Sequence, residues 1–189
     1  FKKGNREMKK LKLVLKKIVI VYLIAFITLA GTTQSFAKTY DSACGEYVSE
    51  YAVDFINKYG ANSVYQATAE VSWSGGSFGS GTLYCCCTSG VKYMYELALG
   101  VNLYDYGYDP MASGNFNAPS TYWDHLPLSE AKPGDILVKE GHVEMYIGNG
   151  QTANFGSSGP AAKIGSNINR FSEVIRLHDV DVNPNGKIS

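Results

Sequence analysis

The chain has 189 residues, which is enough for one domain with a hydrophobic core. It contains 17 Lys and Arg and 17 Asp and Glu, but eight of the basic residues and one of the acidic residues lie in the first 37. The other nine basic and 16 acidic residues give the remainder a net charge of about −7. Because an acidic domain repels phosphate backbones, we do not expect it to bind nucleic acid.

The N-terminal segment has the pattern of a secretory signal peptide. Lysines follow Met8, and an apolar run then extends from Ile18 to about Gly31. This run of roughly 14 residues is short for a membrane span. Ser35-Phe36-Ala37 places small residues where a signal peptidase reads. We predict cleavage after Ala37 and contact with the membrane only through this segment; an uncleaved N-terminal anchor is the alternative.

The next predicted element is a helix that ends at about Tyr59. Asp41 or Ser42 can cap its start, and Gly60 can stop it. Aromatic side chains recur at every fourth position of this segment and form one apolar stripe, which we expect to pack in the core. The stripe consists of Tyr47, Tyr51, Phe55 and Tyr59.

Residues 72–82 are rich in Ser and Gly and predict no stiff element. The pattern is helical again from Thr88 to Leu99, and a glycine ends it. Cys87 precedes Val91 by four residues and falls on the apolar face of this helix. Residues 102–125 predict a long irregular loop of the kind that lines binding clefts.

The four cysteines are Cys44 and the adjacent Cys85, Cys86 and Cys87. In an exported protein they suggest a disulfide, and the sequence leaves open a bond from Cys44 to Cys85 or Cys86. Their spacing does not fit paired zinc knuckles, so we expect no metal site.

Strands are predicted at residues 136–138, 143–147, 151–155 and 174–177. Pro133-Gly134-Asp135 forms a turn before the first of them, and Gly148-Asn149-Gly150 is a hairpin signal between the second and third. Helices followed by a strand meander indicate an α+β fold, with N-terminal helices packed on a small antiparallel sheet.

We accordingly divide the chain into three parts. Residues 1–37 are the signal peptide, with 1–7 as translated upstream sequence. Residues 38–178 form the domain. Residues 179–189 are a polar tail that we expect to fray.

The stretch 141–150 carries the strongest functional signal, because His142 begins a short and mostly apolar strand there. Cys87, His142 and Asn154 follow the chain order of papain-like catalysis. The start of the second helix favours a thiolate and can hold an oxyanion, a histidine can pair with the thiolate, and an asparagine can orient the imidazole. This set suits acyl transfer from an amide; an inert buried thiol and a structural histidine are the alternatives.

These motifs resemble those of the NlpC-type cell-wall peptidases, a papain-like family of small secreted cysteine hydrolases. Residues 71–76, Val-Ser-Trp-Ser-Gly-Gly, are similar to the Tyr-x-Trp-Gly-Gly segment of the family. Residues 87–95 resemble its cysteine block, 133–135 its Pro-Gly-Asp turn, and 141–150 its histidine block very closely. The resemblance covers roughly residues 44 to 155.

Carried over residue by residue, the resemblance implies that Cys87 is the nucleophile, His142 the base and Asn154 the orienting residue. Cys86 stands where the family has Asp, which makes it the alternative nucleophile. Trp73 is expected in the substrate cleft. Glu144 replaces a family glycine at the mouth of the cleft, and we expect its side chain to face solvent.

Two other histidines are weighed against His142. His125 is the rival base, although we interpret it as an exposed loop residue. His178 lies near the tail and is expected to be exposed.

The resemblance implies a monomeric, secreted or wall-associated bacterial endopeptidase that needs no cofactor and acts on peptidoglycan stem peptides. The bond that it implies joins a γ-linked D-glutamyl residue to the following diamino acid. The alternatives are a CHAP-type wall amidase and a non-catalytic wall-binding or effector module with a degenerate site.

Overall fold

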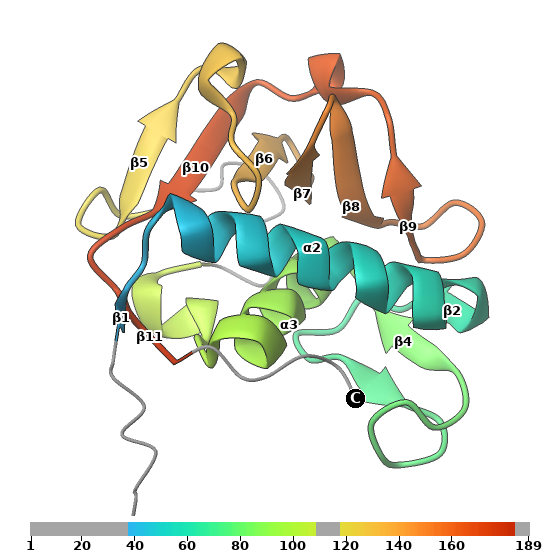
Figure 1. Cartoon of the computed structure of the whole chain (residues 1–189). Coiled ribbons are helices and arrows are strands. Elements are labelled where there is room, and N and C mark those ends of the chain that lie inside the picture. The colour runs from blue at the N-terminus through green and yellow to red at the C-terminus, as the bar shows by residue number, and fades with distance from the viewer. Residues whose placement is uncertain (1–37, 109–117, 184–189) are drawn as a thin grey trace, which may run out of the picture. The chain divides into compact units, whose positions relative to one another are not determined.

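Two helices, α2 (Ser42–Tyr59) and α3 (Cys87–Leu99), lie on one side of a six-stranded antiparallel sheet in this computed structural model (Figure 1). The structure describes residues 38–108 and 118–183. The predicted signal peptide lies outside these residues. Within the described ranges, no helix has the length and apolar character needed to cross a membrane.

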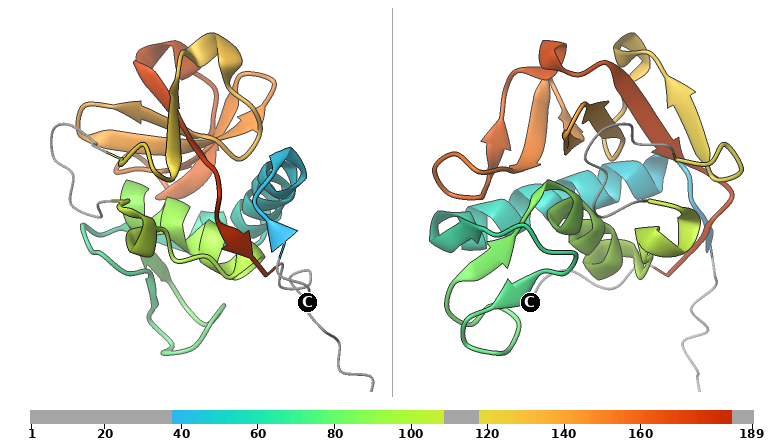
Figure 2. Two further views of the ribbon diagram at one scale, coloured as in Figure 1. Left: turned by 90° about the vertical axis from the view of Figure 1, so that its left-hand side faces the viewer. Right: turned by 180° about the vertical axis from the view of Figure 1, so that it is seen from behind.

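The strand order of the main sheet is β5-β10-β6-β7-β8-β9. Its strands are β5 (Trp123–Leu126), β6 (Ile136–Lys139), β7 (His142–Gly148), β8 (Gln151–Phe155), β9 (Ala162–Gly165) and β10 (Glu173–Leu177). A second sheet has the order β2-β4-β3, with β2 (Ser63–Tyr65), β3 (Ser72–Trp73) and β4 (Leu83–Cys85). It extends beside the far end of α2, as the views of Figure 2 show. The short strands β1 (Lys38–Thr39) and β11 (Asp181–Val182) form a third. The 3-10 turns are η1 (Gly60–Asn62), η2 (Leu103–Tyr106), η3 (Leu128–Glu130) and η4 (Ile168–Arg170).

The predicted helix boundaries are confirmed, with one difference at Gly60. Asp41 caps α2 by accepting a 3.0 Å hydrogen bond from the Cys44 backbone N–H. Gly100 ends α3 in the left-handed conformation, at φ +67°. Gly60 instead stays right-handed, at φ −60°, and the chain continues into η1. A Cβ at Gly60 would lie 2.5 Å from the Ala162 carbonyl oxygen, so a glycine is needed there for close packing.

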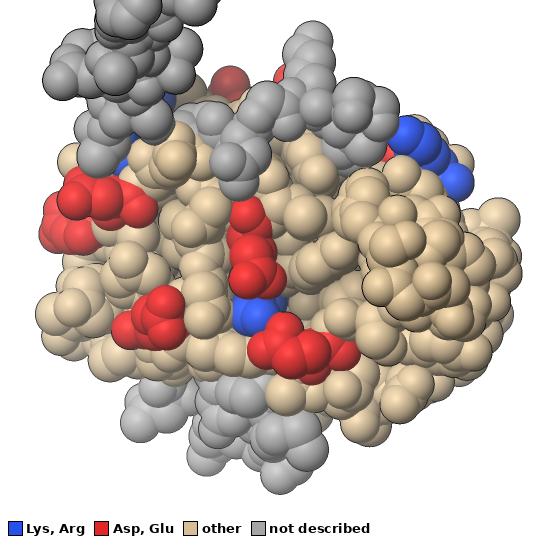
Figure 3. Space-filling model, turned by 90° about the horizontal axis from the view of Figure 1, so that it is seen from below, with Lys and Arg blue, Asp and Glu red and all other residues tan. Residues whose placement is uncertain are grey.

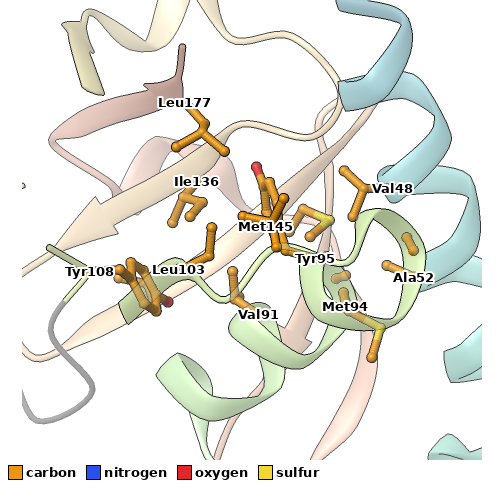
Figure 4. Close-up of a cluster of buried hydrophobic side chains, with 14 of the residues drawn as sticks. Val48, Ala52, Val91, Met94, Tyr95, Leu103, Tyr108, Ile136, Met145 and Leu177 are labelled. Atoms are coloured by element: carbon orange, nitrogen blue, oxygen red, sulfur yellow. The ribbon is translucent and has the colours of Figure 1, made fainter. Parts of the chain in front are cut away.

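The core lies between the two helices and the main sheet. Figure 4 shows side chains of α2, α3, β6, β7 and β10 meeting there, among them Val48, Val91, Ile136 and Met145. All four are fully buried. The apolar stripe predicted for α2 contributes Tyr51 and Phe55 to this core. The helices therefore hold β7, and with it the start of the histidine block, in a fixed place.

The Pro-Gly-Asp turn anchors β6 and β7 to α2 and β10. An added Cβ at Gly134 would lie 2.4 Å from the Gly45 Cα in α2, so the two backbones pack directly on each other. The next residue, Asp135, is 2% exposed. It accepts hydrogen bonds from Arg176 Nε at 2.8 Å and Nη2 at 2.7 Å. Charge-assisted pairs of this bidentate kind are strong and directional.

The four predicted strands are confirmed, but the structure contains further strands, β1 to β5, β9 and β11, that were not predicted. The prediction that residues 72–82 contain no regular element is wrong at Ser72–Trp73, which pair as β3 with β4. The predicted frayed tail is wrong for residues 179–183, because β11 pairs with β1 and buries Val180 and Val182. Residues 184–189 lie outside the described part of the chain.

The structure answers the question of a disulfide that the sequence left open. All four cysteines fall within the described residues, and none forms a disulfide.

The surface charge agrees with the acidic balance of the sequence. Acidic side chains are scattered over the face shown in Figure 3, with few basic ones among them.

Candidate active site

The start of α3 places two thiols next to each other. Strand β4 ends at Cys85, Cys86 is the N-cap of α3, and Cys87 is its first residue. The Cys86 side chain accepts from the backbone of Ser89, whose hydroxyl accepts from the Cys86 N–H at 3.0 Å. This reciprocal pair is a capping box in which a thiol takes the place of the usual oxygen.

The two thiols share a hydrogen bond that separates their pKa values. The hydrogen bond to Cys87 lowers the pKa of Cys86 to about 4 against the effect of burial, and the Ser89 and Thr88 hydroxyls assist. The same hydrogen bond and burial raise the pKa of Cys87. When Cys86 is protonated, its Sγ can donate to the Thr68 carbonyl oxygen at 3.2 Å. The pair therefore releases one proton easily and the second with difficulty.

Cys87 lies beside the strand that carries His142. Helix α3 packs against β7, and a hydrogen bond to the Val143 backbone acts to lower the pKa of the Cys87 thiol. Val143 directly follows His142 in β7. Tyr65 in β2 lies near both thiols. Burial is the main cause that raises the pKa of Tyr65, and negative charge on Cys87 and Cys86 raises it further. Cys87 thus lies beside the strand that begins with His142.

The His142 imidazole is held by a carboxylate. Its Nε2 donates to Glu144 Oε1 at 2.9 Å. Thr152 donates to the other oxygen, Oε2, at 2.5 Å, and Arg170 Nη2 contacts Oε1. The prediction that Glu144 faces solvent is wrong, since the residue is 1% exposed.

The Glu144 carboxylate keeps its charge despite its burial. Burial raises its pKa, but hydrogen bonds from His142 and Thr152 and the positive charge of Arg170 oppose this effect, so that its pKa lies below the ordinary value. A buried carboxylate with these partners can stabilise a positive imidazolium.

Asn154 lies near His142 but makes no comparable contact. It is 7% exposed, and its Oδ1 is buried without a hydrogen-bond partner. It lines a cavity of about 290 Å³ together with His142, Tyr65, Lys139, Arg170 and the loop 156–158. The hydrogen bond to the imidazole that the sequence assigned to Asn154 is made by Glu144 in the structure.

Three other predicted residues lie elsewhere. Trp73 is absent from the lining of this cavity, and its indole packs against the rings of Phe55, Tyr59 and Phe78. The prediction that His125 is an exposed loop residue is correct for its exposure and wrong for the loop, because His125 is in β5. Its Nδ1 pairs with Glu173 at 2.6 Å and its Nε2 contacts the Ala118 carbonyl oxygen at 2.8 Å. The strand order places β10 and β6 between β5 and β7. His178 pairs with Asp179 at 2.9 Å.

Comparison with known proteins gives structural matches only. No protein-family model and no curated protein matches the sequence. Among solved structures, Rv1477, a hypothetical invasion protein of Mycobacterium tuberculosis, is 21% identical over 75% of this chain and 67% of that chain, with a TM-score of 0.50. This likeness shows that the two proteins have the same fold.

Two further structures match at the same identity of 21%. The peptidoglycan hydrolase RipB of Mycobacterium tuberculosis has a TM-score of 0.47 over 75% of this chain and 70% of that one. The NlpC/p60 domain of the peptidoglycan hydrolase SagA has a TM-score of 0.44 over 70% of this chain and 97% of that one. The predicted α+β fold class is confirmed.

Proposed function

We propose that this protein is a secreted cysteine hydrolase of the bacterial cell wall, in which Cys87 is the nucleophile and His142 the general base and acid. The observation that carries the proposal is the place of Cys87 at the first turn of α3, beside Val143 of the strand that begins with His142. The match of residues 141–150 to the NlpC histidine block supports it. The shared fold supports the arrangement of the elements.

The chemistry is amide hydrolysis through a covalent intermediate. The Cys87 thiol passes its proton to His142 as its sulfur attacks the carbonyl carbon of the substrate, and the N–H groups at the start of α3 stabilise the oxyanion. His142 protonates the leaving amine as the thioester forms, and then takes a proton from the water that hydrolyses the thioester. This mechanism uses no metal and no organic cofactor.

The proposed substrate is a peptidoglycan stem peptide, cut between a γ-linked D-glutamyl residue and the following diamino acid. Lys139 and Arg170 bring positive charge to the cavity beside His142, which suits a peptide that carries carboxylates. Export through the segment that ends at Ala37 brings the enzyme to this substrate. N-terminal sequencing of protein from culture medium is then expected to read Lys-Thr-Tyr-Asp.

The proposal is tested by hydrolysis of purified peptidoglycan with single cysteine variants. Cys87→Ala is expected to abolish the release of soluble fragments while circular dichroism shows an intact fold, and Cys86→Ala to retain measurable release. Full activity of Cys87→Ala together with loss in Cys86→Ala would transfer the nucleophile to Cys86. No release by the natural sequence would favour the non-catalytic module.

A further inference from the structure

We propose that Glu144, and not Asn154, is the residue that positions the His142 imidazole for catalysis. This inference rests on the proposed function, because a positioned base has a role only if Cys87 and His142 perform hydrolysis. It assigns to this chain a Cys-His-carboxylate arrangement in which the acidic residue stands two positions after the histidine, on the same strand.

Strand geometry explains why Glu144 reaches the imidazole. Residues two apart in a β-strand point to the same face of the sheet. Val143 and Met145, which alternate with this pair, belong to the core. Glu144 therefore lies beside His142 on the opposite face, and its Oε1 is 2.9 Å from the ring Nε2.

The carboxylate is itself held from two neighbouring segments, as a positioning group must be. Thr152 of β8 donates to its Oε2, and Arg170 of η4 contacts its Oε1. Gly165 of β9 leaves room for this arrangement. A Cβ at Gly165 would lie 2.4 Å from the Thr152 hydroxyl and 3.3 Å from Glu144 Oε2. The buried negative charge of Glu144 in β7 is thus fixed against His142 by residues of β8, β9 and η4.

This hydrogen bond selects the tautomer that hydrolysis needs. Because the carboxylate accepts from Nε2–H, the proton of the neutral ring stays on Nε2, and Nδ1 keeps the lone pair that a general base needs. Once Nδ1 is protonated, the negative charge of Glu144 stabilises the imidazolium. A neutral amide at the same place would orient the ring without this second effect.

In this geometry Asn154 does not position the imidazole, and its amide can take part in substrate binding instead. Its buried Oδ1 has no partner and it lines the cavity next to His142, so an acceptor is presented to whatever occupies that cavity. A buried acceptor without a partner is costly, and an N–H group of a bound substrate would satisfy it. Loss of the Asn154 amide is therefore expected to weaken substrate binding more than the chemical step.

The test compares three variants of the full chain: Glu144→Ala, Glu144→Gln and, as the matched control, Asn154→Ala. The readouts are kcat and KM for peptidoglycan fragments, the imidazole tautomer of His142 by ¹⁵N NMR, and the melting temperature. We expect Glu144→Ala to lose the preference for the Nε2–H tautomer and to reduce kcat about 100-fold with little change in KM.

Glu144→Gln keeps the shape and an acceptor oxygen but no charge, so we expect it to retain the tautomer and to lose kcat by about tenfold. Asn154→Ala is expected to retain both the tautomer and most of kcat and to raise KM. A Glu144→Ala protein that melts at a lower temperature but keeps the tautomer and kcat would reduce Glu144 to a structural role and overturn the inference. Loss of the tautomer in Asn154→Ala alone would also overturn it.

The NMR readout separates this inference from the proposed function. If the natural chain hydrolyses no peptidoglycan, the proposed function fails, and the tautomer of His142 in the Glu144 variants still decides whether Glu144 holds the ring. If hydrolysis occurs and depends on Cys87 but not on Glu144, the function stands and the positioning role fails.

Discussion

Gly90 in α3 packs so closely on Phe155 in β8 that an added Cβ would lie 2.2 Å from the Cγ atom of the ring. Phe155 is 1% exposed and follows Asn154. This contact sets the distance between the first turn of α3, which carries Cys87, and the strands β7 and β8.

Gly90→Ala is therefore expected to destabilise the protein, although alanine favours a helix by about 1 kcal/mol over glycine. Overpacking in a core costs about 1–3 kcal/mol. The added Cβ would clash with Cγ of the buried Phe155 ring, which is not the flexible end of a side chain. Thermal unfolding measures the loss, and the rate of hydrolysis is expected to fall with it. Adding Phe155→Leu to Gly90→Ala is expected to restore part of the stability; a single variant as stable as the natural protein would contradict this account.

The pair Asp135–Arg176 is predicted to stabilise the turn before β6. Arg176→Lys keeps the charge but cannot make the two parallel hydrogen bonds to the buried carboxylate, so we expect a loss of about 1–2 kcal/mol in the free energy of unfolding. Denaturant unfolding measures it. The control is Lys38→Ala, which removes an exposed ion pair of 2.9 Å to Asp41 and is expected to change stability little. Equal effects in the two variants would refute the special role of this pair.

The thiol pair gives a prediction about pH. The hydrogen bond to Cys87 is the largest cause that lowers the pKa of Cys86 to about 4. A lowered pKa means that the thiolate persists as the solution becomes acidic, so the natural protein is expected to show thiolate ultraviolet absorbance well below neutral pH. Cys87→Ala removes this hydrogen bond, raises the pKa of Cys86, and moves the absorbance step to higher pH.

Cys44→Ala is the control for this titration, because burial is the main cause that raises the pKa of Cys44 and the residue holds no thiolate at acidic pH. Its absorbance step is expected to match that of the natural protein. An unchanged step in Cys87→Ala would show that the two thiols do not share a proton.

The helices and the central strands were predictable because their signals are local. A capping Asp41 and an aromatic stripe specify α2 within its own segment, an apolar face and Gly100 specify α3, and Gly148-Asn149-Gly150 specifies the β7–β8 hairpin. Strands β5 and β9 could not be predicted in this way. Residues 123–126 and 162–165 are short and partly polar, and they are strands because they pair with β10 and β8. The same long-range pairing explains β11 in the predicted tail.

Within the candidate site, the place of Cys87 at the start of α3 and of His142 at the start of β7 followed from the motifs, whereas the contact between His142 and Glu144 did not. The sequence did contain the signal, since residues two apart on a strand share a face. The partners that make a buried Glu144 tolerable, Thr152 and Arg170, come from other segments and could not be paired with it from spacing alone.

The most direct measurement for the central claim is mass spectrometry of the fragments that the full chain releases from purified peptidoglycan, with Cys87→Ala as the control. The account predicts fragments with a new amino group on the diamino acid and a new carboxyl group on the γ-linked D-glutamyl residue, and none with Cys87→Ala. Release of whole stem peptides freed from the sugar would instead show a wall amidase. Identical fragments from Cys87→Ala, or no fragments from the natural chain, would contradict the central claim.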